Sequence, residues 1–197
     1  MCIRQAQFER TRNMKGKINK VTIQVVQGDL LTFSAAAVVN DTNTDLALSP
    51  RLISLAGTDV LRETAQIGFC DVGSAVITGA GSLNAQKIIH TVGPRWGEGS
   101  ERGKLASAVF ECLQLAEKHQ LKSIVFPAIS TGALGYPLEN CATTMLTQII
   151  DFTFEDLRFL RSVTICLEDS HALEIFRAEF ARQLDSLKLD DQGKVQV

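Results

Sequence analysis

Cysteine and histidine are scarce in this sequence, and neither occurs at the spacing of a metal site. Among 197 residues there are five cysteines and three histidines, and no C-x-x-C pair is present. The cysteine count is odd and the spacing is wide, which argues against a disulfide framework and against a zinc site. We therefore expect no metal, and we expect the cysteines to be small buried hydrophobic residues in a reducing compartment.

Long apolar runs and basic clusters are also missing. No run of about 18 apolar residues could span a membrane, and residues 1–20 lack the apolar stretch of a signal peptide. We therefore expect an intracellular protein, cytoplasmic or nuclear, without a membrane partner. The net charge is −2 and no long Lys/Arg run occurs, so nucleic acid is a possible partner that the charge does not indicate.

The length and composition are those of one globular domain. With 197 residues, of which 45% are hydrophobic and 21% charged, the chain is long enough to bury a sizeable core. We expect a polar, basic extension over residues 1–18, one domain over 19–187 and a polar tail over 188–197. Met14 is a possible internal start, which would make residues 1–13 an extension. We expect a monomer.

Short apolar runs alternate along the chain with amphipathic stretches. Residues rich in Val and Ile predict six strands, at 21–26, 36–40, 75–78, 87–91, 123–129 and 162–167. Apolar residues at helical spacing predict helices over 50–66, 104–119, 137–151 and 171–187. This alternation is typical of an α/β fold with a mostly parallel sheet covered by helices.

The segment Ser130–Gly135, sequence STGALG, joins a predicted strand directly to a predicted helix. Ligands of open α/β sheets bind beyond the carboxyl ends of the strands, and unpaired N–H groups at a helix start attract anions. Gly132 and Gly135 allow a close approach of the backbone to a phosphate. No lysine follows at the Walker position, so the segment is not a P-loop. The alternative is a tight strand-to-helix turn without a ligand.

Four ordered motifs resemble the macrodomain family of ADP-ribose-binding modules. They are V-Q-G-D-L at 26–30, V-V-N-D-T-N at 38–43, I-I-H-T-V-G-P-R-W at 88–96, and V-F-P-A-I-S-T-G at 125–132 followed by G-Y-P at 135–137. The resemblance covers residues 19–184. It implies a three-layer α-β-α macrodomain-like fold, with a mixed, mostly parallel six-stranded sheet flanked by helices.

The resemblance also implies a ligand, ADP-ribose or an ADP-ribosylated macromolecule, and assigns residues to its parts. Asp29 would accept a hydrogen bond from the adenine amino group, and Leu30 would offer its N–H and an apolar contact. Asn40 would lie beside the distal ribose. The diphosphate would be wrapped by the loop made of Ser130, Thr131, Gly132, Ala133, Leu134, Gly135 and Tyr136. No cofactor is implied.

Each of these assignments has a structural alternative. Asp29 could simply close a strand-end turn, and Asn40 could satisfy its own strand-end backbone. In the family His90 marks a strand end and is not catalytic, and we expect Asn43 to be structural. Arg95 and Trp96 are expected to be surface and packing residues.

The sequence departs from the hydrolytic members of the family after Asn43. The usual glycine run is absent and the loop is about four residues shorter, so Ser49 falls where those members carry an aspartate. A serine cannot act as a carboxylate base. Leu134 replaces a frequent aromatic residue, and no aromatic follows the last strand at Cys166–Asp169 to stack on adenine.

We therefore expect a reader that binds ADP-ribose without turnover. The first alternative is an ADP-ribosyl or ADP-ribose-phosphate hydrolase, with Asn40 and Asp45 as weak catalytic candidates. The second is a degenerate macrodomain kept as an interaction scaffold, its cleft filled by side chains such as Leu48 or Arg51.

Overall fold

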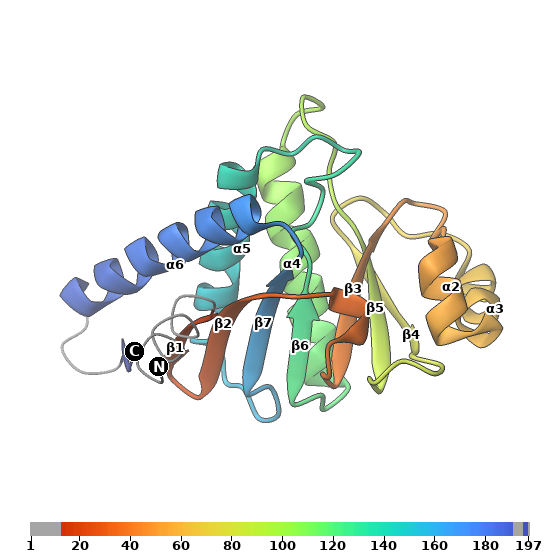
Figure 1. Cartoon of the computed structure of the whole chain (residues 1–197), viewed down its shortest axis with the longest axis horizontal. Helices are drawn as coiled ribbons and strands as arrows, with labels where there is room; N and C mark the ends of the chain where they lie inside the picture. Colours follow the sequence, from red (N-terminus) through yellow and green to blue (C-terminus); the bar gives the residue numbers. More distant parts are fainter. Residues whose placement is uncertain (1–12, 191–194, 197) are drawn as a thin grey trace, which may run out of the picture.

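A computed structural model describes residues 13–190 and 195–196, which build an eight-stranded sheet in the order β4-β5-β3-β6-β7-β2-β1-β8 (Figure 1). The strands are β1 (Asn13–Ile18), β2 (Val21–Gln27), β3 (Ala37–Thr42), β4 (Ala75–Gly79), β5 (Lys87–Val92), β6 (Ser123–Phe126), β7 (Ser162–Leu167) and β8 (Val195–Gln196). The helices are η1 (Leu30–Thr32), α2 (Pro50–Ala56), α3 (Thr58–Ile67), α4 (Glu101–Lys118), α5 (Leu138–Phe152) and α6 (Ser170–Asp190).

All six predicted strands are present, and the five central ones, β5, β3, β6, β7 and β2, run parallel. The remaining strands are antiparallel to their neighbours, β4 at one edge and β1 with β8 at the other. Strand β1 lies inside the segment expected as an extension and forms a hairpin with β2. Its turn, Asn19–Lys20, has Asn19 at φ +53°, a conformation that asparagine tolerates better than most residues.

The sheet is the middle of three layers (Figure 1). Helices α4, α5 and α6 cover one face, where Ile89 of β5 joins the main core. The preceding residue of the strand, Ile88, points to the other face and packs with Leu52 of α2 and Val60 of α3. This alternation follows from the two-residue repeat of a strand, so β5 contributes apolar side chains to both faces of the sheet.

The predicted helix over 50–66 is interrupted. Pro50 opens α2, and the Ser49 hydroxyl accepts a hydrogen bond from the Leu52 N–H at 3.1 Å. Gly57 then adopts φ +91°, which ends α2 and starts α3 in a new direction. Apolar spacing continues through both helices, so periodicity alone could not locate the break.

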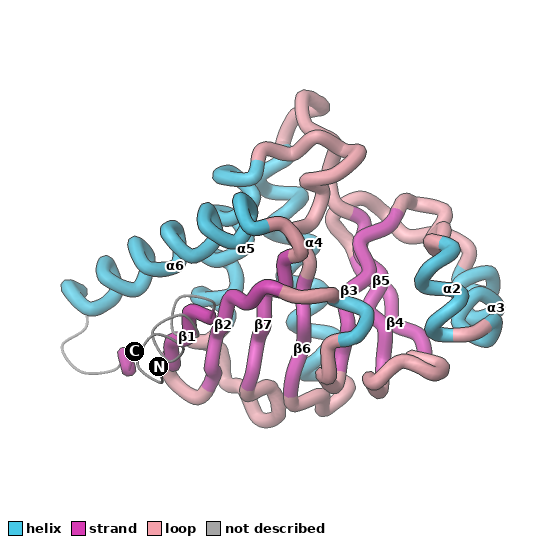
Figure 2. Tube along the Cα trace, viewed as in Figure 1, coloured by secondary structure: helices cyan, strands magenta, loops and turns pink. Residues whose placement is uncertain are grey.

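The loops that follow the central parallel strands gather at one edge of the sheet (Figure 2). The loop after β5 is joined to the loop after β6 by a hydrogen bond from the Trp96 N–H to the Leu134 carbonyl at 3.0 Å. The rings of Trp96 and Tyr136 meet edge to face, with centroids 5.2 Å apart. Within the described residues, no helix is long and apolar enough to cross a membrane.

Candidate functional site

A cleft of about 560 Å³ opens at this edge of the sheet. Three strand-end loops and one residue before β4 form its walls. The lining residues are Asp41, Thr42, Asn43 and Thr44 at and after the end of β3, Val72, then Val92, Gly93, Arg95 and Glu98 at and after the end of β5, and Ser130, Gly132, Ala133 and Leu134 after β6. The cleft thus lies where ligands of open α/β sheets bind.

The loop after β6 presents backbone donors to this cleft. The Tyr136 N–H bonds the Ser130 carbonyl and the Gly135 N–H bonds the Gly132 carbonyl, both at 3.0 Å, which folds the loop back on itself. The four N–H groups of residues 131–134 have no acceptor among the described residues. Consecutive unpaired N–H groups in such a turn form a concave anion site. Of the predicted loop residues, Ser130, Gly132, Ala133 and Leu134 line the cleft, while Tyr136 is buried against Trp96.

Ser130 differs from the rest of this loop because its N–H points inward. That N–H donates to Oδ2 of Asp41 at 2.7 Å, and the N–H of Gly93 stabilises the same carboxylate. Burial nevertheless raises the pKa of Asp41 to about 6. The other carboxylate oxygen, Oδ1, and the Ser130 hydroxyl are both buried without a partner among the described residues.

Sequence reasoning missed Asp41. The available signal was an ionisable residue directly after Asn40, at a strand end that was already expected to border a ligand. The alternation of the strand explains why Asp41 and Asn40 have different roles. Consecutive side chains point to opposite faces, so only one of the two can reach the cleft.

The structure places Asn40 on the sheet face away from the cleft lining. Its Nδ2 lies 3.2 Å from Nδ1 of His90, and the other ring nitrogen lies 2.9 Å from the Thr78 hydroxyl. That hydroxyl donates to the Gly79 carbonyl, so it is free to accept a hydrogen bond from His90. A neutral His90 with its proton on Nε2 donates to Thr78 and accepts from the Asn40 amide at Nδ1, so each of these side chains has a suitable partner. Burial lowers the pKa of His90 to about 4, in keeping with a structural role.

Asn43 lines the cleft, although we expected it to be structural. Its Oδ1 accepts a hydrogen bond from the Ala47 N–H at 3.0 Å, and the Thr42 hydroxyl donates to the Ala47 carbonyl at 2.6 Å. The buried side chain of Leu46 anchors the same turn. The shortened loop is therefore folded compactly beside the cleft, and Asn43 has both a structural bond and an accessible position.

Asp29 and Leu30 lie at the end of β2, outside the lining of the cleft. Oδ1 of Asp29 accepts the Leu31 N–H at 3.1 Å and so caps η1. Its Oδ2 pairs with the Arg51 guanidinium, which lowers the pKa of Asp29, and Arg51 also reaches Glu168 at 3.6 Å. The predicted base-binding carboxylate thus already has two partners in the protein.

The shortened loop after Asn43 contains the two positions considered for a catalytic carboxylate, Ser49 and Asp45. The Ser49 hydroxyl caps α2, and Asp45 is exposed and does not line the cleft. Neither Leu48 nor Arg51 is part of the cleft lining, so these residues do not fill it.

Nothing in the described part of the chain resembles a metal centre. No group of three His, Cys, Asp or Glu side chains within it could hold an ion. Cys70, Cys112, Cys141 and Cys166 are free and buried, as expected, while Cys2 lies outside the described residues.

Comparisons with known proteins agree with this architecture. The sequence model described as the macro domain matches residues 39–145. O-acetyl-ADP-ribose deacetylase 1 of Pantoea vagans is 38% identical over 164 residues, covering 78% of this chain and 95% of the relative. The O-acetyl-ADP-ribose deacetylase of Salmonella typhimurium is 41% identical over 144 residues, covering 66% and 78%.

Among solved structures, the Oceanobacillus iheyensis macrodomain with ADP superposes with a TM-score of 0.84 at 28% identity, covering 88% of this chain and 97% of that one. A mutant form of that macrodomain, solved with ADPR, gives a TM-score of 0.81 at 27% identity, covering 88% and 99%. The predicted macrodomain-like α/β fold is confirmed, with antiparallel strands added at the β1 edge.

Proposed function

Because this chain belongs to the macro domain family, we propose that it binds ADP-ribose in the cleft beside Asp41 and hydrolyses an acyl ester of it. One observation carries the binding proposal, namely the four consecutive N–H groups of residues 131–134 that lack acceptors among the described residues. Backbone donors arranged in this way hold a diphosphate without a lysine, which matches a cleft whose lining contains only one cation, Arg95.

The remaining parts of the ligand follow from the order of the strands. A diphosphate on residues 131–134 leaves the adenosine toward the end of β2, where Asp29 and Leu30 lie, and the distal ribose toward the end of β3. At the β2 end, adenine would have to share the Asp29 carboxylate with Arg51. At the β3 end, the amide of Asn43, a residue of the cleft lining, would bond ribose hydroxyls.

Relatives named as O-acetyl-ADP-ribose deacetylases favour a hydrolase over the reader without turnover that the sequence alone suggested. Ester hydrolysis needs a water molecule oriented toward the acyl carbonyl. The groups available in the cleft are the Asn43 amide and the Asp41 carboxyl. Asn40 and Asp45, the candidates from sequence, lie outside the lining.

A reader without turnover is the second candidate. The observation in its favour is the position of Ser49, whose hydroxyl caps α2 where hydrolytic members carry a carboxylate. A chain that kept the diphosphate loop and lost this base would bind ADP-ribose and release no product.

Two measurements separate these proposals. Calorimetry with ADP-ribose tests binding, and release of acetate from O-acetyl-ADP-ribose tests hydrolysis. Gly132→Glu is the informative variant, because a Cβ at 132 has no neighbour within 4 Å and the new carboxylate would sit in the anion site. We expect affinity to fall at least tenfold.

Gly103→Glu is the matched control, since residue 103 also has open space and lies in α4, outside the cleft lining. Its affinity should equal that of the wild type. Binding with no acetate release would favour the reader. No heat with wild-type protein, or equal affinities for the two glutamate variants, would contradict the binding proposal.

A further inference from the structure

Asp41 joins two walls of the cleft. Its carboxylate accepts the N–H of Ser130 from the loop after β6 and is stabilised by the N–H of Gly93 from the loop after β5. The residue itself lies at the end of β3, so three strand ends meet at one carboxyl group. Asp41 lines the same cleft as Gly132, Ala133 and Leu134, three of the four residues with unpaired N–H groups.

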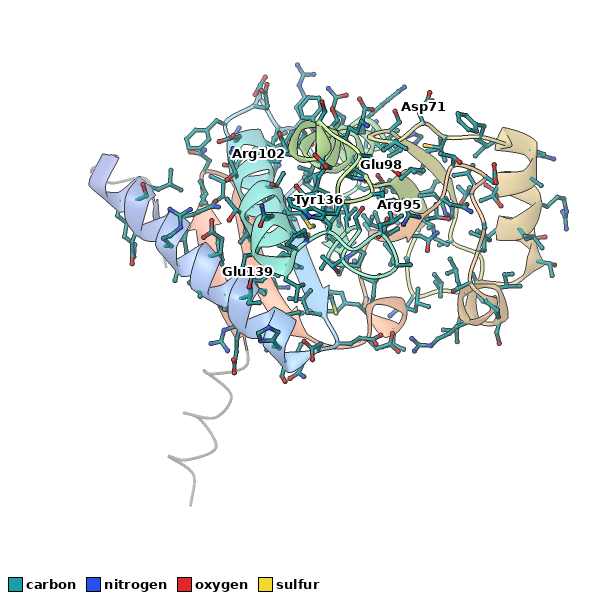
Figure 3. The ribbon with its side chains drawn as sticks, turned by 90° about the horizontal axis from the view of Figure 1, so that it is seen from above. Asp71, Arg95, Glu98, Arg102, Tyr136 and Glu139 are labelled. Carbon is teal, nitrogen blue, oxygen red and sulfur yellow. The ribbon has the colours of Figure 1, made fainter. Side chains whose placement is uncertain are left out.

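Within the described residues, no cation pairs with this carboxyl group. From the helix side it is faced by two buried thiols, Cys112 of α4 and Cys141 of α5, whose pKa values burial raises far above neutrality, so both are uncharged. The cation of the cleft lining, Arg95, lies beside Glu98 and pairs with it at 3.4 Å (Figure 3). His90, although in the neighbouring strand, points to the opposite face and is neutral.

The geometry creates a conflict when the cleft takes an anion. A diphosphate on residues 131–134 would lie in the same cleft as an ionised Asp41, and the two like charges would repel each other. Two buried polar atoms, Asp41 Oδ1 and the Ser130 hydroxyl, lack partners among the described residues at this point. A neutral carboxylic acid would remove the repulsion and supply a hydrogen-bond donor there.

We propose that Asp41 takes up a proton when the cleft binds its diphosphate ligand, so that the bound anion lies beside a neutral carboxylic acid. This inference rests on the proposed binding of ADP-ribose and names the protonation state in which the site holds that ligand.

The sign of the pH dependence follows directly. In the free protein the pKa of Asp41 is about 6, and a bound anion raises it further. Between these two values binding draws a proton from solution, so affinity increases as the pH falls. ADP-ribose is the right probe, because its diphosphate lacks the terminal phosphate group whose pKa is near 6 in ADP.

Calorimetry of ADP-ribose binding from pH 5.5 to 8.0, in two buffers of different ionisation enthalpy, tests the proposal. The wild type should bind at least threefold more tightly at pH 5.5 than at 8.0, with proton uptake. Asp41→Asn keeps the shape and an amide oxygen for both N–H groups, so it should show neither effect and should bind more tightly than wild type at pH 8.0.

Asp151→Asn is the control, a matched change at an exposed residue of α5 outside the cleft. Its pH dependence should match that of the wild type. Equal pH dependence in wild type and Asp41→Asn would overturn the inference while leaving the proposed function intact. If ADP-ribose gives no heat at any pH, the proposed function fails, and inorganic pyrophosphate becomes the probe. If the ratio of the pyrophosphate dissociation constants of wild type and Asp41→Asn changes with pH, the inference is still supported. A ratio that does not change with pH, or no pyrophosphate binding, would overturn it.

Discussion

The Ser130 hydroxyl occupies the space that a side chain at residue 93 would fill. A Cβ built on Gly93 would lie 1.9 Å from Ser130 Oγ and 2.6 Å from a methyl carbon of Ile129. Both distances are far below contact distance, so the loop after β5 and the loop after β6 fit together only because residue 93 has no side chain. The backbone of Gly93 itself is not in the left-handed region, so packing and not conformation requires this glycine.

We predict that Gly93→Ala destabilises the fold by about 1–3 kcal/mol, the range for overpacking a close-packed site, and weakens ligand binding in the cleft. Urea unfolding measures the first effect and calorimetry the second. Ser130→Gly removes the nearest clashing atom, and glycine accepts the φ of +64° at that position. Gly93→Ala should therefore cost less stability in the Ser130→Gly background than in the wild type. Additive losses would show that the two residues are not in contact.

Asp41 should make the protein less stable as the pH rises. Its pKa is about 6 in the folded chain against an ordinary value of 3.8, so the folded state holds a proton that the unfolded state has released between these values. Stability is then lost as the pH rises from about 4 to 6, and the penalty is complete above 6. The difference in pKa corresponds to at most roughly 3 kcal/mol.

Asp41→Asn removes this penalty, and we expect it to unfold at higher urea concentration than wild type at pH 7.5. The advantage should shrink as the pH falls to 4.5, where the wild-type carboxyl is largely protonated. Equal midpoints at pH 7.5 would show that the carboxylate is better solvated than its burial indicates.

His90 should have the opposite effect. Its pKa is lowered from 6.5 to about 4, so between these values the unfolded chain gains a proton that the folded chain does not. This contribution destabilises the fold as the pH falls from about 6.5 to 4, and it partly cancels the effect of Asp41 in wild type. The Asp41→Asn variant should therefore show a steeper loss of stability on acidification than wild type. Direct NMR titration of the His90 ring, with no protonation above pH 5, checks the cause.

Asn40 and Asn43 should separate stability from binding. Asn40→Ala leaves Nδ1 of His90 without its partner in a buried row, and we expect a loss of roughly 1–3 kcal/mol. Asn43→Asp keeps the oxygen that accepts the Ala47 N–H while removing the amide donors from the cleft, so the fold should survive and ADP-ribose affinity should fall at least tenfold. The reverse pattern, with binding lost only in Asn40→Ala at unchanged stability, would return the ribose role to Asn40.

The strands and the long helices could be predicted because each carries a strong periodic signal. In the runs at 21–26 and 162–167, Val and Ile alternate with Thr, Gln or Ser at the two-residue period of a strand, and the two strands pair with one another. Strand β1 gave a weak signal because exposed Lys15 and Lys17 alternate with Gly16 and Ile18, and only Ile18 is strongly apolar. Packing, not pattern, makes Gly16 a core position, since a Cβ there would be 3.0 Å from Leu184.

The site was harder to predict than the fold. The phosphate loop has a local signature, strand then glycines then helix, and the cleft formed there. The partition between Asn40, Asp41 and Asn43 depends on where the strand ends and which face each side chain takes, and a shift of one residue reverses it. The Arg51–Asp29 pair joins residues from two separate elements, so no local pattern announced it.

The pairing of β2 with β7 has a consequence for how the chain assembles. Strands β1 and β2 form a hairpin that leads into Asp29. The hairpin joins the rest of the sheet through β7, which lies about 140 residues later in the chain and pairs with both β2 and β6. The edge that holds the cleft is complete by residue 136, whereas the hairpin has no place in the sheet until residue 167 has left the ribosome. The two ends proposed to bind ADP-ribose would therefore be brought together late in synthesis, by a single strand.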